Sequence, residues 1–386
     1  MDLDTLRNAN FKLLDDAVKD WSNLVKHLET LKKDAEDELH QAAIKADWAG
    51  VNSQVTGQFI GKTAGEFSDA HTQATTIHKI LDDTRNELKD YHQQLVDAIE
   101  GGRKKNLTVI GYEGGFTVTT NVPPEGRAAQ DEDKQSEITT LRDQLQKILD
   151  KATESDNSAK TVLQAIADQS KLGFSDASYK DRDSAAEAVK QADEMAKLAK
   201  KDPKDLTVKE FDDLVAGLKK YGNDGLFAER FATTLGPEKT LQFWAGVTDP
   251  HRGNYDLFHD RRDQLDDLQH SLGTTLANAT QSDSVAMTEW KRTVIDNADK
   301  FINDNRGPMG FQVMSNLMRT GDYDDQFLKE YGTKLMATER KYTGNGEHAN
   351  SVWLHGMPTG PQLNWIGEDS GNDPLTGYLK GLSNSP

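Results

Sequence analysis

The sequence contains no cysteine and no long apolar run. Without cysteine there are no disulfide bonds, no thiol catalysis and no thiolate metal sites, although the cellular compartment stays open. No segment approaches the ~18 consecutive apolar residues of a membrane-spanning helix, and residues 1–11 have neither the basic region nor the apolar core of a signal peptide. We therefore expect no membrane span, and a protein that either stays in the cytosol or is exported by a route that recognises a folded element.

Hydrophobic residues are also scarce, at 35% of the 386 residues. This low share favours elongated helices with much solvated surface over a single thick core. The 64 acidic residues outnumber the 46 basic ones, which leaves a formal charge of −18. This charge disfavours nucleic acids and anionic membranes as the main partner, because both repel it.

What the sequence does have is helical periodicity. Over residues 3–42 the apolar positions keep to one face of a helix, which predicts one long helix. A second pattern of this kind occupies residues 55–98, and the break between the two lies at residues 46–50. Two helices of matched length with a short turn predict an antiparallel hairpin over residues 1–102, which the glycine pair at 101–102 ends.

Beyond this helical hairpin the pattern changes. Residues 107–112 and 116–120 are rich in β-branched side chains and flank Glu113-Gly114-Gly115. They predict a two-stranded β-hairpin within a linking region of residues 103–126, followed by a polar connector that extends to Lys134.

Residues 127–203 contain a third heptad helix, over 138–166, and an alanine-rich helix. We expect this region to pack on the helical hairpin or to extend it. The polar residues Ser155, Asp156 and Asn157 interrupt the third apolar stripe. They mark either the end of a packing partner or a contact that sets the helix register.

Residues 204–386 hold eight of the thirteen Phe and four of the six Trp, which predicts a compact aromatic-cored helical domain. Its first helix opens with Thr207-Val-Lys-Glu210, the pattern of a capping box. A Gly/Asn-rich loop follows near the end of the chain, and its two Trp favour a loop ordered against the domain surface. The predicted fold class is thus mainly α: a long antiparallel helical hairpin or coiled-coil bundle with a small β-hairpin, then a compact all-α domain. We expect the chain to be part of a longer protein.

The two helical arms, joined at Trp48-Ala49-Gly50, resemble the Trp-X-Gly family of helical hairpins exported by type VII (ESX) secretion systems, and the related Leu-X-Gly N-terminal domains of polymorphic toxins. The segments that begin at Leu226, Leu235 and Gly371 look like an uncharacterised helical domain that follows such hairpins in large actinobacterial exoproteins. By this resemblance, Trp48 packs where the helices cross and Gly50 permits the turn.

Substrates of that family often carry a Tyr-x-x-x-Asp/Glu signal just after the hairpin. That place is empty here, because Tyr91 is followed four residues later by Leu95. The match at Tyr179 and Asp183 lies far beyond the hairpin and is a weak secretion signal. Either a partner supplies the signal in trans, or this chain is not itself a substrate.

Catalytic motifs are sparse: phosphate-binding loops, nucleophile elbows and zincin helices have no counterpart in the sequence. His251, Asp256, His259 and Asp260 have the residue types of a divalent metal hydrolase. Arginines and further aspartates among them favour a solvated, charged helix start instead. We therefore expect no catalytic, cofactor or metal site; an enzyme that uses this cluster is the alternative, and it predicts bound metal.

The remaining histidines are interpreted as structural. His348 and His355 lie in the Gly/Asn-rich loop with Glu347 as their only acidic neighbour, which favours a structural loop over a ligand site. Five others lie along the two arms of the helical hairpin: His27, His40, His71, His78 and His92. Surface positions on the helices are the preferred interpretation, and a pH-sensitive release of a partner is the alternative.

The predicted function is the non-enzymatic secretion, docking and spacer portion of a large exoprotein or polymorphic toxin secreted by a type VII system. Its partners would be a small Trp-X-Gly-type hairpin protein and the secretion ATPase, or a second copy of the chain, with no nucleic acid. The third helix of the chain is the other candidate to complete a four-helix bundle with the hairpin. We expect a secreted or cell-surface protein; the alternative is a cytoplasmic coiled-coil scaffold that assembles with itself. The residues expected at the bundle interface are Phe67, Ile77, Leu81, Leu88, Leu95, Ile138, Leu141, Leu145 and Ile148.

Overall fold

The computed structural model describes residues 1–35, 51–169, 181–249, 259–302, 307–345, 347, 353 and 362–385, with the side chains of the longest helix described from Gly65 onward. The chain divides into two compact units. Unit 1 comprises residues 1–164 and 178–186, and unit 2 comprises residues 165–177 and 187–386. The fold is mainly α with a small antiparallel β-hairpin, which confirms the predicted class.

Unit 1 begins with two helices where one was predicted. Helix α1 (Leu3–Arg7) is separated from α2 (Lys12–Asp34) by a short non-helical segment. There, the side-chain oxygen of Asn10 accepts a hydrogen bond from the backbone N–H of Lys12 at 3.0 Å. The side-chain amide of Asn8 donates to the carbonyl oxygen of Asp4 at 2.9 Å. Asparagine side chains compete in this way for backbone donors and acceptors, so Asn8 and Asn10 interrupt a helix that the apolar spacing alone would continue.

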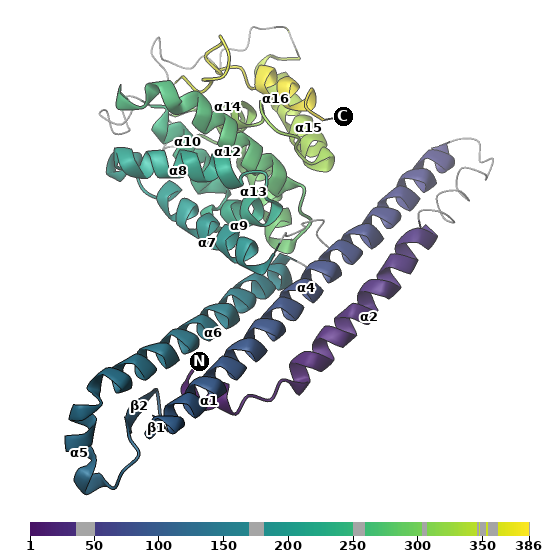
Figure 1. The fold of residues 1–386 in the computed structure, drawn as a ribbon. Coiled ribbons are helices and arrows are strands. Elements are labelled where there is room, and N and C mark those ends of the chain that lie inside the picture. The colour runs from purple at the N-terminus through teal and green to yellow at the C-terminus, as the bar shows by residue number, and fades with distance from the viewer. Residues whose placement is uncertain are drawn as a thin grey trace. The chain divides into compact units, whose positions relative to one another are not determined.

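Helix α2 runs antiparallel along α4 (Val51–Lys104), as Figure 1 shows. The predicted end of this second arm at the glycine pair is wrong, because α4 continues through Gly101 and Gly102 to Lys104. The chain leaves the helix at Asn106, which adopts a left-handed conformation with φ of 60°. Asparagine is one of the few residues besides glycine that tolerate this conformation, so it takes over the terminating role.

Strands β1 (Leu107–Tyr112) and β2 (Gly115–Thr120) form the predicted β-hairpin, in which Leu107 pairs with Thr120. The segment after it is helical rather than the predicted connector: α5 (Pro124–Asp133) starts with proline, whose fixed φ suits a first helical turn. The carboxylate of Asp131 in α5 accepts hydrogen bonds from both threonine hydroxyls at the end of β2, each at 2.7 Å. These bonds tie the two-stranded ribbon to a helix, which a ribbon of this size requires for stability.

Helix α6 (Gln135–Gln169) packs against α4 through a shared apolar cluster, to which α1 and the β-hairpin also contribute. Leu145 and Leu95 are fully buried there, as are Leu3 and Leu6. Helix α7 (Arg182–Ala199) follows. The division between the two units falls inside α6 and inside α7.

Unit 2 is built from short helices with explicit end signals. The predicted capping box is confirmed at the start of its first long helix, where Thr207 and Glu210 bond reciprocally. The described elements, in chain order, are η2 (Pro203–Asp205), α8 (Val208–Tyr221), α9 (Gly225–Leu235), α10 (Pro237–Val247), η3 (Arg262–Gln264), α12 (Leu265–Thr280), α13 (Val285–Asn297), α14 (Gly310–Leu317), α15 (Asp325–Tyr342) and α16 (Pro374–Leu382).

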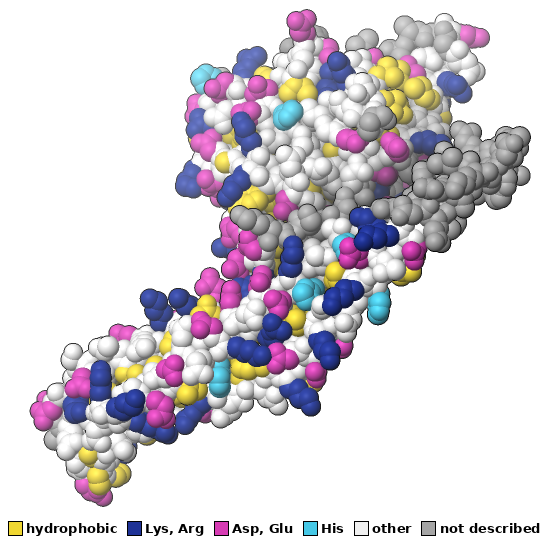
Figure 2. All heavy atoms as spheres, turned by 45° about the vertical axis from the view of Figure 1, so that its right-hand side comes forward, with side chains coloured by type: hydrophobic (Ala, Val, Ile, Leu, Met, Phe, Trp, Pro, Cys, Tyr) yellow, Lys and Arg dark blue, Asp and Glu magenta, His cyan; other side chains and the backbone are white. Residues whose placement is uncertain are grey.

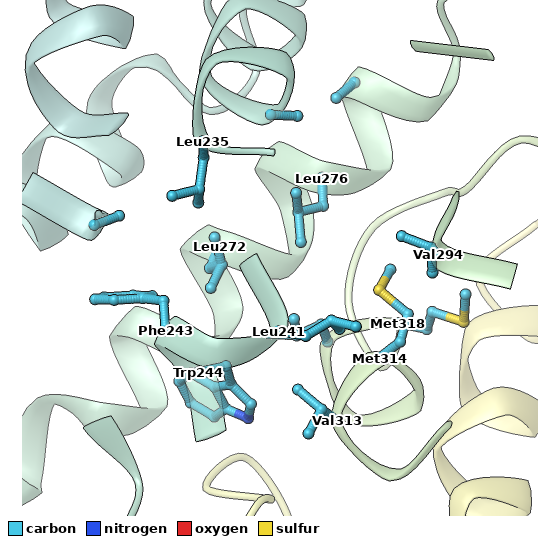
Figure 3. Close-up of a cluster of buried hydrophobic side chains, with 14 of the residues drawn as sticks. Leu235, Leu241, Phe243, Trp244, Leu272, Leu276, Val294, Val313, Met314 and Met318 are labelled. Atoms are coloured by element: carbon cyan, nitrogen blue, oxygen red, sulfur yellow. The ribbon is translucent and has the colours of Figure 1, made fainter. Parts of the chain in front are cut away.

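The core of unit 2 is large and rich in aromatic side chains, as predicted. Figure 3 shows Trp244 and Leu241 of α10 facing Leu272 of α12 and Val313 of α14. The indole N–H of Trp244 donates to the carbonyl oxygen of Leu363 at 3.0 Å, so a polar group inside the core is satisfied by the segment that covers it.

Candidate functional site

The apolar face of α2 consists of two parallel rows. The inner row is Leu14, Val18, Trp21, Val25 and Leu28, in alternating steps of four and three, and its side chains are buried or half-buried. This spacing is that of a helix seam, and α4 is the helix against which α2 packs. The inner row is therefore the seam of the hairpin.

The outer row of α2 consists of Leu13, Ala17, Leu24 and Leu31. Its leucine side chains are more exposed than the side chains of the inner row. The leucine side chains are 83%, 41% and 45% exposed, respectively. Leu13, Ala17 and Leu24 each lie one residue before an inner-row position, and Leu31 follows Leu24 by seven positions on the same face. One residue turns the chain by about 100° around a helix, so α4 covers the inner row and leaves the outer row open.

An exposed apolar row of this kind needs an explanation. Single surface leucines are normal, but a regular row on one helix marks an interaction site in a soluble protein. Figure 2 shows hydrophobic side chains at the surface at intervals along the helical arm, among acidic and basic ones. The outer row is the candidate docking surface of unit 1.

The residues predicted at the bundle interface, none of which lies in α2, fall into two groups. Leu88 and Leu95 of α4 share one buried cluster with four residues of α6, so the third helix of the chain occupies this place beside α4. The remaining α4 residues, Phe67, Ile77 and Leu81, are half-buried and lie outside that cluster. The four α6 residues are Ile138, Leu141, Leu145 and Ile148.

A buried arginine, which the sequence pattern did not predict, joins three helices of unit 1. Arg182, the first residue of α7, is 4% exposed. It donates hydrogen bonds to Ser155 of α6 at 2.8 Å, to Thr84 of α4 at 3.3 Å and to Glu87 of α4 at 2.8 Å. Burial by itself would lower the pKa of this guanidinium, but the hydrogen bonds to the Glu87 and Asp183 carboxylates outweigh it and the pKa is raised.

One residue of the predicted secretion signal, Asp183, contacts this arginine. Asp183 accepts a hydrogen bond from Arg182 at 2.8 Å while its side chain stays largely exposed. Tyr179, the other half of the signal, lies outside the described residues, as do Trp48 and Gly50 of the predicted turn. The secretion signal and the Trp-X-Gly turn therefore stay predictions.

The metal-type cluster is only partly described. His259 and Asp260 are exposed, and the Nδ1 atom of His259 lies 3.5 Å from a carboxylate oxygen of Asp260. His251 and Asp256 lie outside the described residues, as do His348 and His355 of the loop. Among the residues with described positions, no group of three or more acidic or histidine side chains is arranged to hold a metal ion.

A hollow of about 520 Å³ in unit 2 is lined by Leu226 and Val285 together with Glu229 and Glu289. Two carboxylates of its lining are already engaged: Ser284 donates to Glu229 at 2.5 Å, and Arg292 pairs with Glu289. Neither Glu229 nor Glu289 is therefore poised as a free base.

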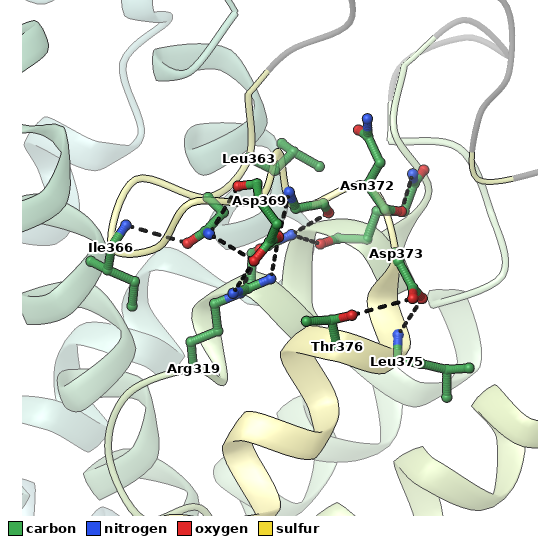
Figure 4. A network of polar contacts seen from close by, with 12 residues as sticks. Arg319, Leu363, Ile366, Asp369, Asn372, Asp373, Leu375 and Thr376 are labelled. Carbon is green, nitrogen blue, oxygen red and sulfur yellow. Dashed lines mark hydrogen bonds and ion pairs between the residues drawn. The ribbon is translucent and has the colours of Figure 1, made fainter.

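A cluster of polar side chains in unit 2 holds part of the Gly/Asn-rich loop in place. Arg319 after α14 pairs with Asp369 through two bonds of 2.9 and 2.7 Å, and Asn364 donates to the same carboxylate (Figure 4). Asn316 donates to the carbonyl oxygen of Gly371 at 2.6 Å. These bonds hold residues 362–373 against α14, so the expected ordering of this loop is confirmed over its described part.

No described helix is both long enough and apolar enough to cross a bilayer. Residues 124–303 match a protein family of unknown function (DUF6571). No curated protein and no solved structure matches the chain. The family match starts at α5, so α2 and α4, which form the hairpin and its candidate docking surface, precede it.

Proposed function

We propose that unit 1 is a docking element that binds another helix along the outer row of α2. The observation that carries this proposal is the exposure of Leu13, Leu24 and Leu31 on a helix whose other apolar row is already covered. Helix α6 occupies the open side of α4 in cis. Helix α2 is therefore the member of the bundle whose apolar face is left for a partner.

The small size of the outer row limits the binding free energy that it can contribute. A leucine side chain taken fully out of water contributes ~1.5–3 kcal/mol, and the leucines of α2 are already partly covered. Association of two proteins costs at least ~4 kcal/mol in lost freedom of motion. The outer row alone thus supports a weak complex, and a specific one needs further contacts beside it.

The resemblance of the arms to Trp-X-Gly hairpins supplies the biological setting of the proposal. In this setting the chain is the non-enzymatic docking and spacer portion of an exoprotein or polymorphic toxin exported by a type VII system, and the partner is a small hairpin protein of the same kind that acts together with the secretion ATPase. Trp48 and Gly50 would occupy the turn between the arms.

Export and docking are tested together in a host that encodes the chain. We expect the chain in culture supernatants of the host, and its loss from them when the ESX ATPase gene is deleted. The double variant Leu24→Asp with Leu31→Asp should also stay inside the cells. Its matched control is Leu379→Asp with Leu382→Asp, which alters two leucines of similar exposure on α16 and should be exported normally. Equal release with and without the ATPase, or release in neither case, contradicts export.

The same row supports one alternative, a cytoplasmic scaffold that assembles with itself, because an exposed apolar row can pair with its own copy. This alternative predicts a molar mass in light scattering that rises with concentration and falls back to the monomer in the Leu24→Asp, Leu31→Asp variant. A monomer at all concentrations contradicts it.

A further inference from the structure

A second row of residues lies beside the outer row of α2. Each member follows an outer-row residue by three positions: Asp16 after Leu13, Asp20 after Ala17, His27 after Leu24 and Asp34 after Leu31. All four side chains are exposed. Three residues turn the chain by about 60° in the direction opposite to the inner row. The acidic row, Asp16, Asp20 and Asp34, therefore borders the apolar row on the side away from α4.

The acidic row is not engaged by the described part of the chain. Asp16, Asp20 and Asp34 have no ion pair or side-chain hydrogen bond among the described residues. Their neighbour Asp15 behaves differently: it pairs with Lys89 of α4 at 2.6 Å and lies near Arg85 at 3.7 Å. The acidic side chain that faces α4 is thus paired within the chain, while those that border the outer row remain available to a partner.

We infer that the helix docked on the outer row carries Lys or Arg side chains along the edge of its own apolar row. This inference rests on the proposed function, that α2 binds a helix there. Ion pairs along a helix interface fix the choice and orientation of the partner. They also supply the further contacts that the short apolar row needs for a specific complex.

A second copy of the chain fits this surface poorly. Two α2 helices paired antiparallel through their outer rows would place the acidic row of one copy close to that of the other, and like charges across an interface suppress such pairing. The formal charge of −18 adds repulsion over longer distances. The same charge attracts a basic partner.

Three synthetic amphipathic peptides of about 28 residues, four heptads, test the inference. They share one apolar row and carry Lys, Gln or Glu beside it. Their binding to the full chain is measured by fluorescence anisotropy at low and high salt. We expect the Lys peptide to bind at least tenfold more tightly than the Glu peptide at low salt, and the difference to shrink at high salt.

Variants of the chain separate the two rows. The triple variant Asp16→Asn, Asp20→Asn, Asp34→Asn should bind the Lys peptide about tenfold more weakly, because each exposed ion pair raises the affinity by a few-fold. The charge-matched control Asp143→Asn, Asp150→Asn, Asp156→Asn changes exposed residues of α6 and should bind as the unaltered chain does. The double variant Leu24→Asp, Leu31→Asp should abolish binding of all three peptides.

The outcomes distinguish the inference from the function on which it rests. If all three peptides bind equally, the triple Asn variant has no effect and the leucine variant still abolishes binding, the docking surface stands and the basic partner is wrong. Tighter binding of the Glu peptide also overturns the basic partner. If no peptide binds, or if the leucine variant binds as the unaltered chain does, the docking surface is wrong as well.

Discussion

The guanidinium of Arg182 donates a 2.8 Å hydrogen bond to the hydroxyl of Ser155, 27 positions earlier in the chain. Both side chains are buried. Ser155 is the polar residue that interrupts the apolar stripe of the third helix, so the interruption is a contact that sets the register of α6. A buried polar pair of this kind fits in one alignment of the helices, because a shift along the helix axis leaves its donors unpaired.

The first prediction concerns this contact. Arg182→Met should destabilise unit 1 by about 2 kcal/mol, because it removes the donor to the buried hydroxyl of Ser155 and one of the two partners of the Thr84 hydroxyl, which keeps its bond to the carbonyl oxygen of Ile80. The effect should be measured as lost hydrogen-exchange protection of the α6 amides on both sides of Ser155. Arg142→Met is the control: Arg142 is exposed and, among the described residues, pairs with its neighbour Asp143 alone, so the free energy of protection should change by less than about 0.5 kcal/mol. Equal effects of the two changes would refute a special role for Arg182.

The glycine pair of α4 gives the second prediction, in which adjacent residues behave oppositely. A Cβ atom at Gly101 meets no atom within 4 Å, and the residue is inside a helix. Gly101→Ala should therefore stabilise unit 1 by about 0.5–1 kcal/mol. A Cβ atom at Gly102 would lie 2.5 Å from Cδ2 of Leu141, and the displaced leucine should cost about 1–3 kcal/mol.

Urea unfolding of the two alanine variants measures both effects. If the pair were the end of the helix, as the sequence pattern predicts, Gly101→Ala would not stabilise the protein. A destabilised Gly101→Ala variant would therefore contradict the extension of α4 to Lys104.

The third prediction concerns the stability of the protein at low pH. Lys201 and the backbone N–H of Thr207 donate hydrogen bonds to Glu210, which lowers the pKa of this carboxyl from 4.5 to about 2. Because the pKa is lower in the folded state, the charged carboxylate stabilises the fold above pH 4.5. That contribution is lost as the pH falls from about 4.5 to 2.

Glu210→Gln tests this dependence. The difference in thermal midpoint between the variant and the unaltered chain should be largest above pH 5 and should vanish near pH 2. A difference that is constant across this range would mean that the capping box depends on packing rather than on the charge of Glu210.

The fourth prediction compares a buried leucine with a leucine of the outer row. Leu145→Ala should cost about 2–5 kcal/mol of stability, because Leu145 is fully buried between α6 and α4. Leu31→Ala should cost under about 1 kcal/mol, since its side chain is 45% exposed. Chemical unfolding of the isolated chain measures both. A cost at Leu31 close to that at Leu145 would mean that the outer row serves folding rather than docking.

Several elements could be predicted from signals carried by residues close together in the sequence. The β-hairpin follows from its β-branched runs around Gly114, and the capping box follows from Thr207 and Glu210, because each depends on residues close together in the chain. The break between α1 and α2 was missed because the apolar spacing continues across it, while the competing side chains of Asn8 and Asn10 carry no periodic signal.

The docking surface was only partly predictable. Leu13 and Leu14 are both apolar, so the sequence shows one broad stripe and not which of its two rows faces α4. The partners of Arg182 on α4 and α6 lie between 27 and 98 positions away. No local pattern connects residues at that separation, and the contact emerges only from the packing of α4, α6 and α7.

The central claim is that another helix covers the outer row of α2 in the cell. A photo-crosslinking amino acid placed at Leu24, in the host that encodes the chain, tests this claim directly. Lys26 is the control, because two residues turn the chain by about 200° and place it on the other side of the same helix. We expect one discrete adduct from position 24 and none from position 26, with the crosslink mapped by mass spectrometry to an amphipathic helix rich in Lys or Arg. The absence of an adduct at position 24, equal adducts at both positions, or an adduct only with a second copy of the chain would contradict the claim.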